Sequence, residues 1–575
     1  MISRKEYNII LFSVTLCWAS SYIFIKDLPS GLSSFAYLTL TAGIAGVILL
    51  AIFHRMLKNL DRRTVLRGFF LAVFITGNML LEKLGLDHIP SSTASFLASL
   101  NIVIVPLILL FFLKKSPTKN NIVGILVIMM GLFVSNGIVS TSDDSSGFFF
   151  MFGACVLMSI YTVASTEFTK QSDPLVLCIL QLCFSAVIGF ILWSIEDPAT
   201  FANIEWSNRM LSSIFILAFF SKAYAYIMLM YAEKYADAIS VTVIASTEPV
   251  VTLTLALLIP NSQGEAETFS MRALIGAVII ALGAFVANSN FLSSKEELAK
   301  AKVAKKKAAA ETKARLQPTK NQTTVSRVIR RVNHFLVTMI PFAVLGAAFK
   351  VMVLVEGFTE VRPANAIPMI SGYLFGPFGA IGCAVGNLIA DFFGTLNLTS
   401  LLGVVGNFMA AYVPYRMWYA ISREKPNVHS WKNILIFLWT AYVSALVCAW
   451  ILGFGLELFF STWIDTIYKY VLLNNFGFSI ALGLPVFILT TSDSIKLSLH
   501  EPTRIEKPHV FKGGKWVYFF LAAATVLFTC IAVGVYMGYH LSTTPVMGIL
   551  SILAGVCLVM IFLLPVKKGT PVNEQ

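Results

Sequence analysis

Charged residues are scarce in this chain. They make up 13% of its 575 residues, whereas hydrophobic residues make up 57%, and the mean hydropathy is +0.78. Soluble domains carry about 25% charged residues. A chain with so little charge cannot cover a large apolar core with polar surface, so lipid must be the solvent on its flanks. The composition therefore argues against a soluble enzyme and predicts an integral membrane protein.

The sequence also lacks the motifs of metal and nucleotide chemistry. Its eight cysteines lie in apolar runs without a CxxC pair, and its seven histidines are scattered, so neither a disulfide framework nor a zinc site is predicted. Gly513-Gly514-Lys515 lacks the earlier glycine and the following Ser or Thr of a phosphate-binding loop. No catalytic set can be argued from scattered residues. We therefore predict no enzyme activity, no cofactor, no metal and no ATP hydrolysis by this chain itself.

Positive charge is concentrated in one segment. The net charge is +13, and residues 295–331 hold twelve Lys or Arg against Glu296, Glu297 and Glu311, which supplies +9 of it. The basic character therefore indicates a cytoplasmic linker and no nucleic-acid surface. Basic segments close to the inner leaflet attract anionic headgroups, and such contact is expected here as a consequence of tethering.

Long apolar runs predict the membrane spans, because a spanning helix needs about 20 mostly apolar residues. Ten runs come first, at about 8–25, 33–53, 68–86, 92–113, 121–138, 147–166, 174–194, 211–231, 238–259 and 271–290. Six follow, at about 335–355, 366–376, 378–394, 400–420, 433–455 and 473–490, and a last pair lies at 516–539 and 545–565. The total is eighteen predicted spans, with the short glycine-rich runs on either side of Pro377 counted as two.

Loop charges predict the orientation, because Lys and Arg collect on the cytoplasmic side. The second loop is strongly basic, with His54, Arg55, Lys58, Arg62, Arg63 and Arg67, whereas the fifth carries Asp143 and Asp144 and no base. Even-numbered loops are basic or balanced, and odd-numbered loops are acidic or neutral. We expect a multi-pass protein of the plasma membrane with both termini in the cytoplasm.

An internal repeat divides the first ten spans. The segment from Asn121 to Asn136 matches the segment from Ala273 to Asn288, with paired glycines at Gly124 and Gly131 and at Gly276 and Gly283. Two five-helix halves place corresponding helices in opposite orientations, which gives an inverted repeat. Transporters of this build bind substrate near the midplane, between the halves.

The predicted fold is an all-α polytopic membrane protein, with a ten-helix inverted 5+5 repeat followed by a six-helix membrane module and a terminal helix pair. The predicted parts are the first half at 1–138, the second half at 139–292, a basic cytoplasmic linker at 293–331, the six-helix module at 332–495, and a basic loop with the terminal pair at 496–575.

The first ten spans resemble the drug/metabolite transporter superfamily in its EamA-type form. The resemblance is carried by Trp18-Ala-Ser20-Ser21, by Ser95 to Leu100 leading to Pro106, by Ser246-Thr-Glu248-Pro249, and by the paired glycine helices. One departure is Lys114-Lys115, which stand where the family often has a glutamate. The resemblance implies a transporter of small solutes, working in the export direction.

The six-helix module resembles an S component of an energy-coupling-factor vitamin transporter. The resemblance is carried by Arg362-Pro-Ala-Asn365-Ala-Ile-Pro368, by Leu374 to Gly382, and by Gly386-Asn387-Leu-Ile-Ala-Asp391. It implies that the loop after the first helix helps to cap a vitamin-like ligand. It also implies separate energising subunits as partners.

Ionisable residues inside a span are costly, so each is a candidate functional residue. Lys222 lies near the middle of the eighth span and Glu248 precedes Pro249 in the ninth, so both are candidates for substrate charge or proton coupling. For Lys222 the alternative is a side chain that reaches the interface or pairs structurally. For Glu248 it is a polar partner of the proline kink. Glu82, in contrast, is predicted to form a local surface pair with Lys83.

Polar and aromatic residues complete the two candidate sites. In the first unit they are Trp18, Tyr161, Tyr226 and Asn101, for which packing and interhelical hydrogen bonding are the alternatives. In the second module they are Arg362 and Asn365, by resemblance, and Asn387, Asp391 and Asn407 on or near the glycine-rich helices.

The leading hypothesis is a secondary transporter that moves a small organic metabolite or drug-like solute across the bilayer by alternating access. The first alternative is binding or uptake of a vitamin-like solute through the C-terminal module with energising subunits. The second is a membrane scaffold or regulator that transports nothing. The sequence leaves the solute, the coupling ion and the oligomeric state open.

Overall fold

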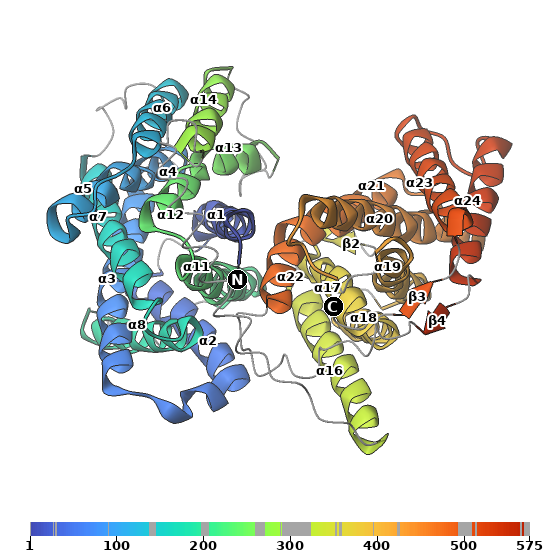
Figure 1. Ribbon diagram of the computed structural model, residues 1–575, viewed down its shortest axis with the longest axis horizontal. Coiled ribbons are helices and arrows are strands. Elements are labelled where there is room, and N and C mark those ends of the chain that lie inside the picture. The colour runs from blue at the N-terminus through green and yellow to red at the C-terminus, as the bar shows by residue number, and fades with distance from the viewer. Residues whose placement is uncertain are drawn as a thin grey trace, which may run out of the picture. The chain divides into compact units, whose positions relative to one another are not determined.

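The structure is a computed structural model of the whole chain (Figure 1). It describes residues 2–26, 28, 32–89, 91–136, 145–196, 206–258, 271–287, 289, 324–350, 353–355, 359–394, 396–422, 426–492, 509–511, 514–563 and 566–568. Two compact units form, Ser3–Ala314 and Arg315–Gln575, with Met1–Ile2 assigned to the second. The predicted linker as far as residue 323, and the acidic loops at 137–144, 197–205 and 259–270, lie outside the described residues.

The first unit contains a helix in each of the ten predicted spans. Its helices are α1 (Arg4–Lys26), α2 (Ser34–Phe53), η1 (His54–Asn59), α3 (Arg62–His88), α4 (Ser91–Ala98), α5 (Asn101–Leu113), α6 (Lys119–Asn136), α7 (Ser145–Phe168), α8 (Pro174–Glu196), α10 (Asn208–Ile216), the π-helical η2 (Leu217–Tyr224), α11 (Ala225–Glu233), α12 (Ala238–Ala245), α13 (Glu248–Leu258) and α14 (Met271–Ala287). The fourth and ninth spans are each broken in two, between α4 and α5 and between α12 and α13.

The repeated glycines lie where α6 and α14 cross, side by side (Figure 1). A Cβ built on Gly131 would lie 2.8 Å from the backbone nitrogen of Ile280, and a Cβ on Gly283 would lie 2.7 Å from that of Ile128. These two contacts are equivalent under the sequence repeat. Small residues let helix backbones approach closely in lipid. The glycines of the repeat are therefore packing residues.

Other helix pairs follow the same symmetry. The repeat relates α1 to α7, α3 to α11 and α5 to α13. Accordingly, α3 packs on α7 and α11 packs on α1, while α5 packs on α7 and α13 packs on α1. α2 packs on its own counterpart, α8. Each of these contacts therefore has an equivalent in which the two halves change places. This is the pattern expected for two halves related by a pseudo-twofold axis.

Gly124 offers a stability test of this crossing. A Cβ there would lie 2.4 Å from the Ala287 Cβ and 2.5 Å from its backbone nitrogen, so Gly124→Ala forces the two backbones apart. We expect a loss of about 1–3 kcal/mol of stability, measured by thermal unfolding of the purified protein. Gly43→Ala is the matched control, because its Cβ would meet only the Ala186 Cβ, at 3.8 Å. Equal stability of the two variants would contradict the close crossing.

The second unit also contains a helix in each predicted span. Its elements are α16 (Thr324–Ala348), β1 (Val353–Val355), β2 (Thr359–Glu360), η3 (Pro363–Ala366), α17 (Ile367–Phe375), α18 (Pro377–Asp391), α19 (Ser400–Ile421), α20 (Trp431–Phe460), α21 (Asp465–Phe478), the π-helical η4 (Ser479–Gly483), α22 (Leu484–Thr491), β3 (His509–Phe511), α23 (Gly514–Tyr536), α24 (Pro545–Leu563) and β4 (Val566–Lys568). β1 pairs antiparallel with β2, and β3 with β4.

The boundaries of the first two helices decide how the second site is built. The apolar run to residue 355 was predicted to be one helix, but α16 ends at Ala348 and the run continues as strand β1, which begins the β-hairpin. The two glycine-rich runs are separate helices, as predicted. Gly376 separates them with φ +58°, a left-handed conformation that glycine adopts at little cost.

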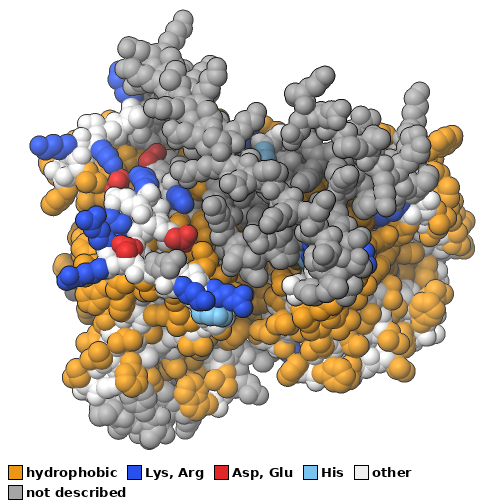
Figure 2. Space-filling view, turned by 60° about the horizontal axis from the view of Figure 1, so that its bottom comes forward, with side chains coloured by type: hydrophobic (Ala, Val, Ile, Leu, Met, Phe, Trp, Pro, Cys, Tyr) orange, Lys and Arg blue, Asp and Glu red, His pale blue; other side chains and the backbone are white. Residues whose placement is uncertain are grey.

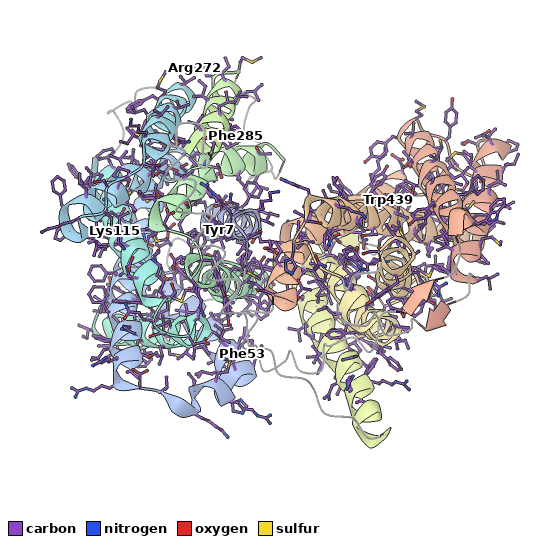
Figure 3. All side chains as sticks on the ribbon, viewed as in Figure 1. Tyr7, Phe53, Lys115, Arg272, Phe285 and Trp439 are labelled. Atoms are coloured by element: carbon purple, nitrogen blue, oxygen red, sulfur yellow. The ribbon has the colours of Figure 1, made fainter. Side chains whose placement is uncertain are left out.

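The terminal helix pair packs on the six-helix module. Trp439 of α20, which is labelled in Figure 3, lies near α23. Its indole N–H donates to Thr525 Oγ1 of α23 at 3.0 Å. Arg416 of α19 donates to the carbonyl oxygens of Ile561 and Phe562 at the end of α24, at 2.8 and 2.7 Å. The pair is therefore held by polar contacts as well as by apolar packing.

The surface is that of a membrane protein. Figure 2 shows apolar side chains over much of the visible face, with Lys and Arg gathered in part of it. By length and composition, twelve helices in the described part of the chain can cross a membrane, and α6 and α14 are shorter apolar helices. The predicted all-α polytopic class is confirmed.

Candidate functional site

A cavity with an empty volume of about 720 Å³ lies inside the first unit. Its wall includes residues of α1, α3, α5 and α7 and of the π-helix, α11, α12 and α13, so both halves of the repeat contribute to it. Its charged residues are Glu82, Lys222 and Glu248.

The breaks in the fourth and ninth spans both lie beside this cavity. Asn101 is the first residue of α5, and Glu248 is the first residue of α13; both line the cavity and are buried. Each break is an irregular turn within one span, because the first N–H groups after it bond to carbonyl oxygens just before it, as Ile102 N–H does to Ser99 and Val250 N–H does to Thr247.

Lys222 lies in a π-helical turn. The turn inserts an extra residue in the helix between α10 and α11, and such π-bulges occur frequently at functional sites. The side chain is 3% exposed and its Nζ lies 5.7 Å from the centre of the Tyr37 ring. The alternative that Lys222 reaches the membrane interface therefore does not fit the structure.

Glu82 was assigned wrongly from the sequence. It lines the cavity and interacts electrostatically with Lys222, whereas Lys83 is buried and pairs with Asp87, one helical turn further on. Adjacent residues on a helix point in different directions, and residues four apart are neighbours. The phenol of Tyr22 interacts with the carboxylates of both Glu82 and Glu248. The two acids therefore belong to one polar cluster.

Aromatic rings cover another part of the cavity wall. Trp18 and Tyr226 line it with ring centres 5.7 Å apart, and the Trp18 indole donates to the carbonyl oxygen of Ser221 at 3.2 Å. Tyr161 is not among the lining residues. It is fully buried behind Tyr226, with ring centres 6.1 Å apart, and donates its hydroxyl to Gln181 Oε1 at 3.0 Å.

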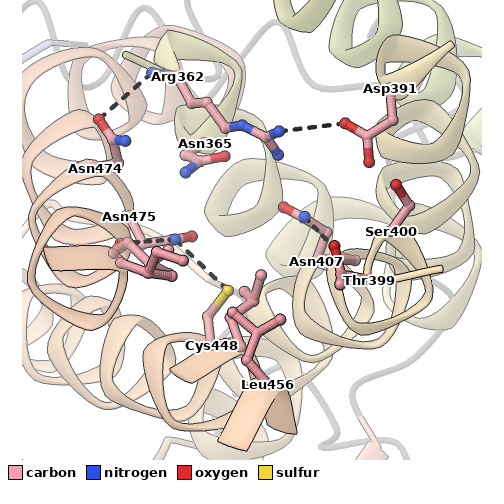
Figure 4. Close-up of a pocket in the computed structure, with 14 residues that line it drawn as sticks. Arg362, Asn365, Asp391, Thr399, Ser400, Asn407, Cys448, Leu456, Asn474 and Asn475 are labelled. Atoms are coloured by element: carbon pink, nitrogen blue, oxygen red, sulfur yellow. Dashed lines mark hydrogen bonds and ion pairs between the residues drawn. The ribbon is translucent and has the colours of Figure 1, made fainter. Parts of the chain in front are cut away.

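A second cavity, with an empty volume of about 620 Å³, lies inside the second unit (Figure 4). Four buried charges lie on one side of it. Lys350 Nζ lies 2.9 Å from both Glu360 Oε1 and Asp391 Oδ1, and Arg362 lies 2.8 Å from Glu360 and 3.2 Å from Asp391. Burial acts to lower the pKa of Arg362, but the charges of Glu360 and Asp391 raise it above its ordinary value. The two cations and two anions balance.

Amide side chains form much of the rest of this wall. Asn365 and Asn407 line the cavity, and the side-chain oxygen of each is buried without a hydrogen-bond partner among the described residues. The side-chain oxygen of Asn474 accepts a hydrogen bond from the backbone N–H of Arg362 at 3.4 Å. Asn387 lies behind the wall and accepts from Arg362 Nη1 at 2.7 Å. The β-hairpin thus places Arg362 against the end of α18, and η3 places Asn365 in the cavity wall.

Comparison with known families decides what these units are. Residues 6–137 and 145–289 match the EamA-like transporter family, and residues 336–492 match the QueT transporter family. The chain is a membrane transporter that joins an EamA-like unit to a QueT-like unit. Both resemblances drawn from the sequence are confirmed. The terminal helix pair lies beyond the QueT match.

Two relatives match about half of the chain. An "Uncharacterized transporter" of Archaeoglobus fulgidus is 23% identical over 249 residues, 43% of this chain and 76% of the relative. Another from the same organism is 23% identical over 283 residues, 49% of this chain and 98% of the relative. A solved structure described as "Crystal structure of protein" is 19% identical, with a TM-score of 0.41, and covers 50% of this chain and 97% of its own. These names give no solute.

Proposed function

We propose that the EamA-like unit moves a small organic metabolite or drug-like solute by alternating access between its two halves, as a secondary active exporter. The cavity carries this proposal. Glu82 comes from the first half, and Lys222 and Glu248 come from the second, so relative movement of the halves changes their spacing. A solute that contacts both halves can then bias the movement.

The roles of the lining residues follow from their chemistry. Lys222 is the contact for an anionic or electron-rich group of the solute. Glu248 and Glu82 accept a cationic group or a coupling proton. Trp18 and Tyr226 pack against the apolar part of the solute, and Asn101 donates or accepts a hydrogen bond. Tyr161 supports Tyr226 from behind.

The solute is the first thing to measure. We expect untargeted mass spectrometry to find a solute retained by the purified full-length protein, and proteoliposomes to move that solute down an imposed gradient. Liposomes with Glu82→Gln and Glu248→Gln together are expected to move it poorly. If the wild-type protein retained a solute only at the QueT-like unit and gave no flux, the result would favour the hypothesis of a membrane scaffold or regulator.

A second function is supported by the QueT-like unit. We propose that its cavity binds a vitamin-like solute, which Arg362 and Asn365 cap and Asn407 contacts, with Asp391 and Asn387 holding Arg362 in place. The unpartnered amide oxygens of Asn365 and Asn407 favour a polar ligand with hydrogen-bond donors. Transport through this unit would need separate energising subunits.

The division of the chain is also a proposal. We place the two halves at 1–138 and 139–292, the linker at 293–331, the QueT-like unit at 332–495 and the terminal pair at 496–575. We place the protein in the plasma membrane, with both termini in the cytoplasm and the linker near anionic headgroups. Cysteine labelling of each terminus in intact cells tests this orientation, because a label that reacts from outside contradicts it.

A further inference from the structure

The terminal helix pair, α23 and α24, has no role in either proposed function so far. It lies beyond the segment that matches the QueT family, yet its buried side chains belong to the same hydrophobic cluster as part of the cavity wall. That cluster contains Cys448 and Leu456, which line the cavity (Figure 4), together with Phe528 of α23 and Leu558 of α24. The pair is therefore packed directly behind the wall of the second cavity.

Helix α20 has the cavity on one face and the terminal pair on the other. Its cavity residues Cys448, Leu452 and Leu456 are four apart in the sequence and form one stripe along the helix. Trp439 and Glu457 contact the terminal pair. With 3.6 residues per turn, both lie on the far side of α20 from that stripe. A single helix thus connects the pair to the cavity.

Helix α19 is arranged in the same way. Gly403 and Asn407 line the cavity, whereas Arg416 lies on the opposite face and donates to carbonyl oxygens at the end of α24. The ring of Tyr412, one turn before Arg416, packs against the ring of Phe562 with centres 5.2 Å apart. The terminal pair therefore supports two helices of the cavity wall from behind.

The cavity lies at one end of the second unit, which we call the cavity end. Asp391 ends α18 and Ser400 begins α19, while Leu456 lies near the end of α20 and Ile467 near the start of α21; all four line the cavity. Because consecutive spans run in opposite directions, these four positions lie at the same end. The turn between α23 and α24 lies there too, since it contacts Glu457, the residue after Leu456.

Glu457 joins two turns at the cavity end. Its carboxylate accepts the backbone N–H groups of Leu541 and Ser542 at 3.0 and 2.7 Å and the Ser542 hydroxyl at 2.6 Å, and it lies 2.7 Å from His540 Nδ1. The ring of Trp463, in the turn after α20, stacks on the His540 ring with centres 4.9 Å apart. The Glu457 side chain is 6% exposed, so losing these bonds would leave a buried carboxylate without donors.

We propose that the terminal pair is a clamp on the wall of the QueT-like cavity, with Glu457 as the residue that positions the end of α20. The proposal rests on the solute-binding function proposed above for this cavity. While the bonds of Glu457 are made, Cys448 and Leu456 stay in the cavity wall and retain the solute. When the bonds are broken, the end of α20 separates from the turn between α23 and α24, and the wall loosens.

The clamp is tested with N-ethylmaleimide as the probe, so the solute need not be known. Cys448 is 1% exposed in the cavity wall; Cys383 of α18 is fully buried and is not among the lining residues. In the full-length protein, we expect Glu457→Gln to raise the alkylation rate of Cys448 about tenfold or more and to leave that of Cys383 unchanged. Peptide mass spectrometry measures both rates. Equal rates at Cys448 in wild type and variant overturn the proposal, and so does a rise at both cysteines, because the whole unit has then loosened.

Two further variants sharpen this result. Asp465→Asn is the matched control, because Asp465 is near the same turn but pairs with Lys469 of its own helix, and it should leave the rate at Cys448 unchanged. A rise equal to that of Glu457→Gln would overturn the role of Glu457. Ser542→Ala keeps the carboxylate and both backbone donors, so we expect a smaller rise in the same direction. It serves if Glu457→Gln does not fold, and an unchanged rate at Cys448 then overturns the clamp.

The clamp and the binding proposal fail differently. A protein that retains no solute at the QueT-like unit, but shows the change at Cys448, contradicts binding and leaves the clamp standing. A wild-type protein that retains a solute there, with the same Cys448 rate as Glu457→Gln, contradicts the clamp and leaves binding standing. If both proposals are correct, mass spectrometry should find about tenfold less retained solute in Glu457→Gln than in wild type.

Discussion

Replacing Lys222 with methionine is expected to stop solute transport by the EamA-like unit while the protein still reaches the membrane. Methionine keeps the length of the side chain and removes its charge. A hydrogen bond to a charged group contributes about 1.5–3 kcal/mol, so losing it weakens solute binding about 10- to 100-fold. Flux of the retained solute into proteoliposomes measures the loss.

The same substitution destabilises the protein, which must be separated from the loss of transport. Lys222 is 3% exposed and interacts electrostatically with Glu82, which is partly buried. Removing the lysine charge leaves the Glu82 carboxylate with less electrostatic compensation, so we expect a loss of stability. Adding Glu82→Gln neutralises the charge left behind. We therefore expect Lys222→Met/Glu82→Gln to recover stability and to remain inactive in transport.

Lys115→Met is the matched control for the loss of a lysine charge. The Lys115 side chain is 55% exposed and pairs with Glu167 at the surface. Surface ion pairs contribute at most about 1 kcal/mol, so this variant should keep both stability and flux. Normal flux in the stable double variant would show that Lys222 is only structural and would remove it from the site.

Hydropathy was sufficient to predict the helices, because lipid requires each spanning segment to bury its own backbone hydrogen bonds. The repeat predicted two inverted halves, whereas the crossing of α6 and α14 at Gly131 and Gly283 was found only in the structure. The break after Ala98 was not predicted, since neither glycine nor proline lies beside it, whereas Pro249 marks a kink close to the break after Ala245. The two breaks place Asn101 and Glu248 at helix starts, which span boundaries alone do not reveal.

The charged residues were predicted less well than the helices. Lys222 and Glu248 stood out because charge is rare in a span, but Glu82 was assigned to its sequence neighbour. Counting four residues forward from Lys83 to Asp87 would have left Glu82 without a local partner.

Neutralising Asp391 is expected to have the largest effect in the QueT-like unit. Asp391 is 4% exposed and pairs with both Lys350 and Arg362. Asp391→Asn leaves two buried cations against Glu360 alone, which costs about 3–5 kcal/mol. The side chain also lines the cavity, so we expect the variant to lose its retained solute. Thermal unfolding and mass spectrometry of bound solute measure the two effects.

Asp465→Asn is the control in the same unit. Asp465 is 42% exposed and pairs with Lys469 one turn along α21, an arrangement that contributes about 0.3–0.5 kcal/mol. Lys350→Met/Asp391→Asn provides the rescue, because it leaves one cation, Arg362, facing one anion, Glu360. We expect this double variant to regain much of the stability that Asp391→Asn loses, because charge balance holds the loop with Glu360 and Arg362 over the cavity. Stability of Asp391→Asn equal to that of Asp465→Asn would mean that the four charges do not act together.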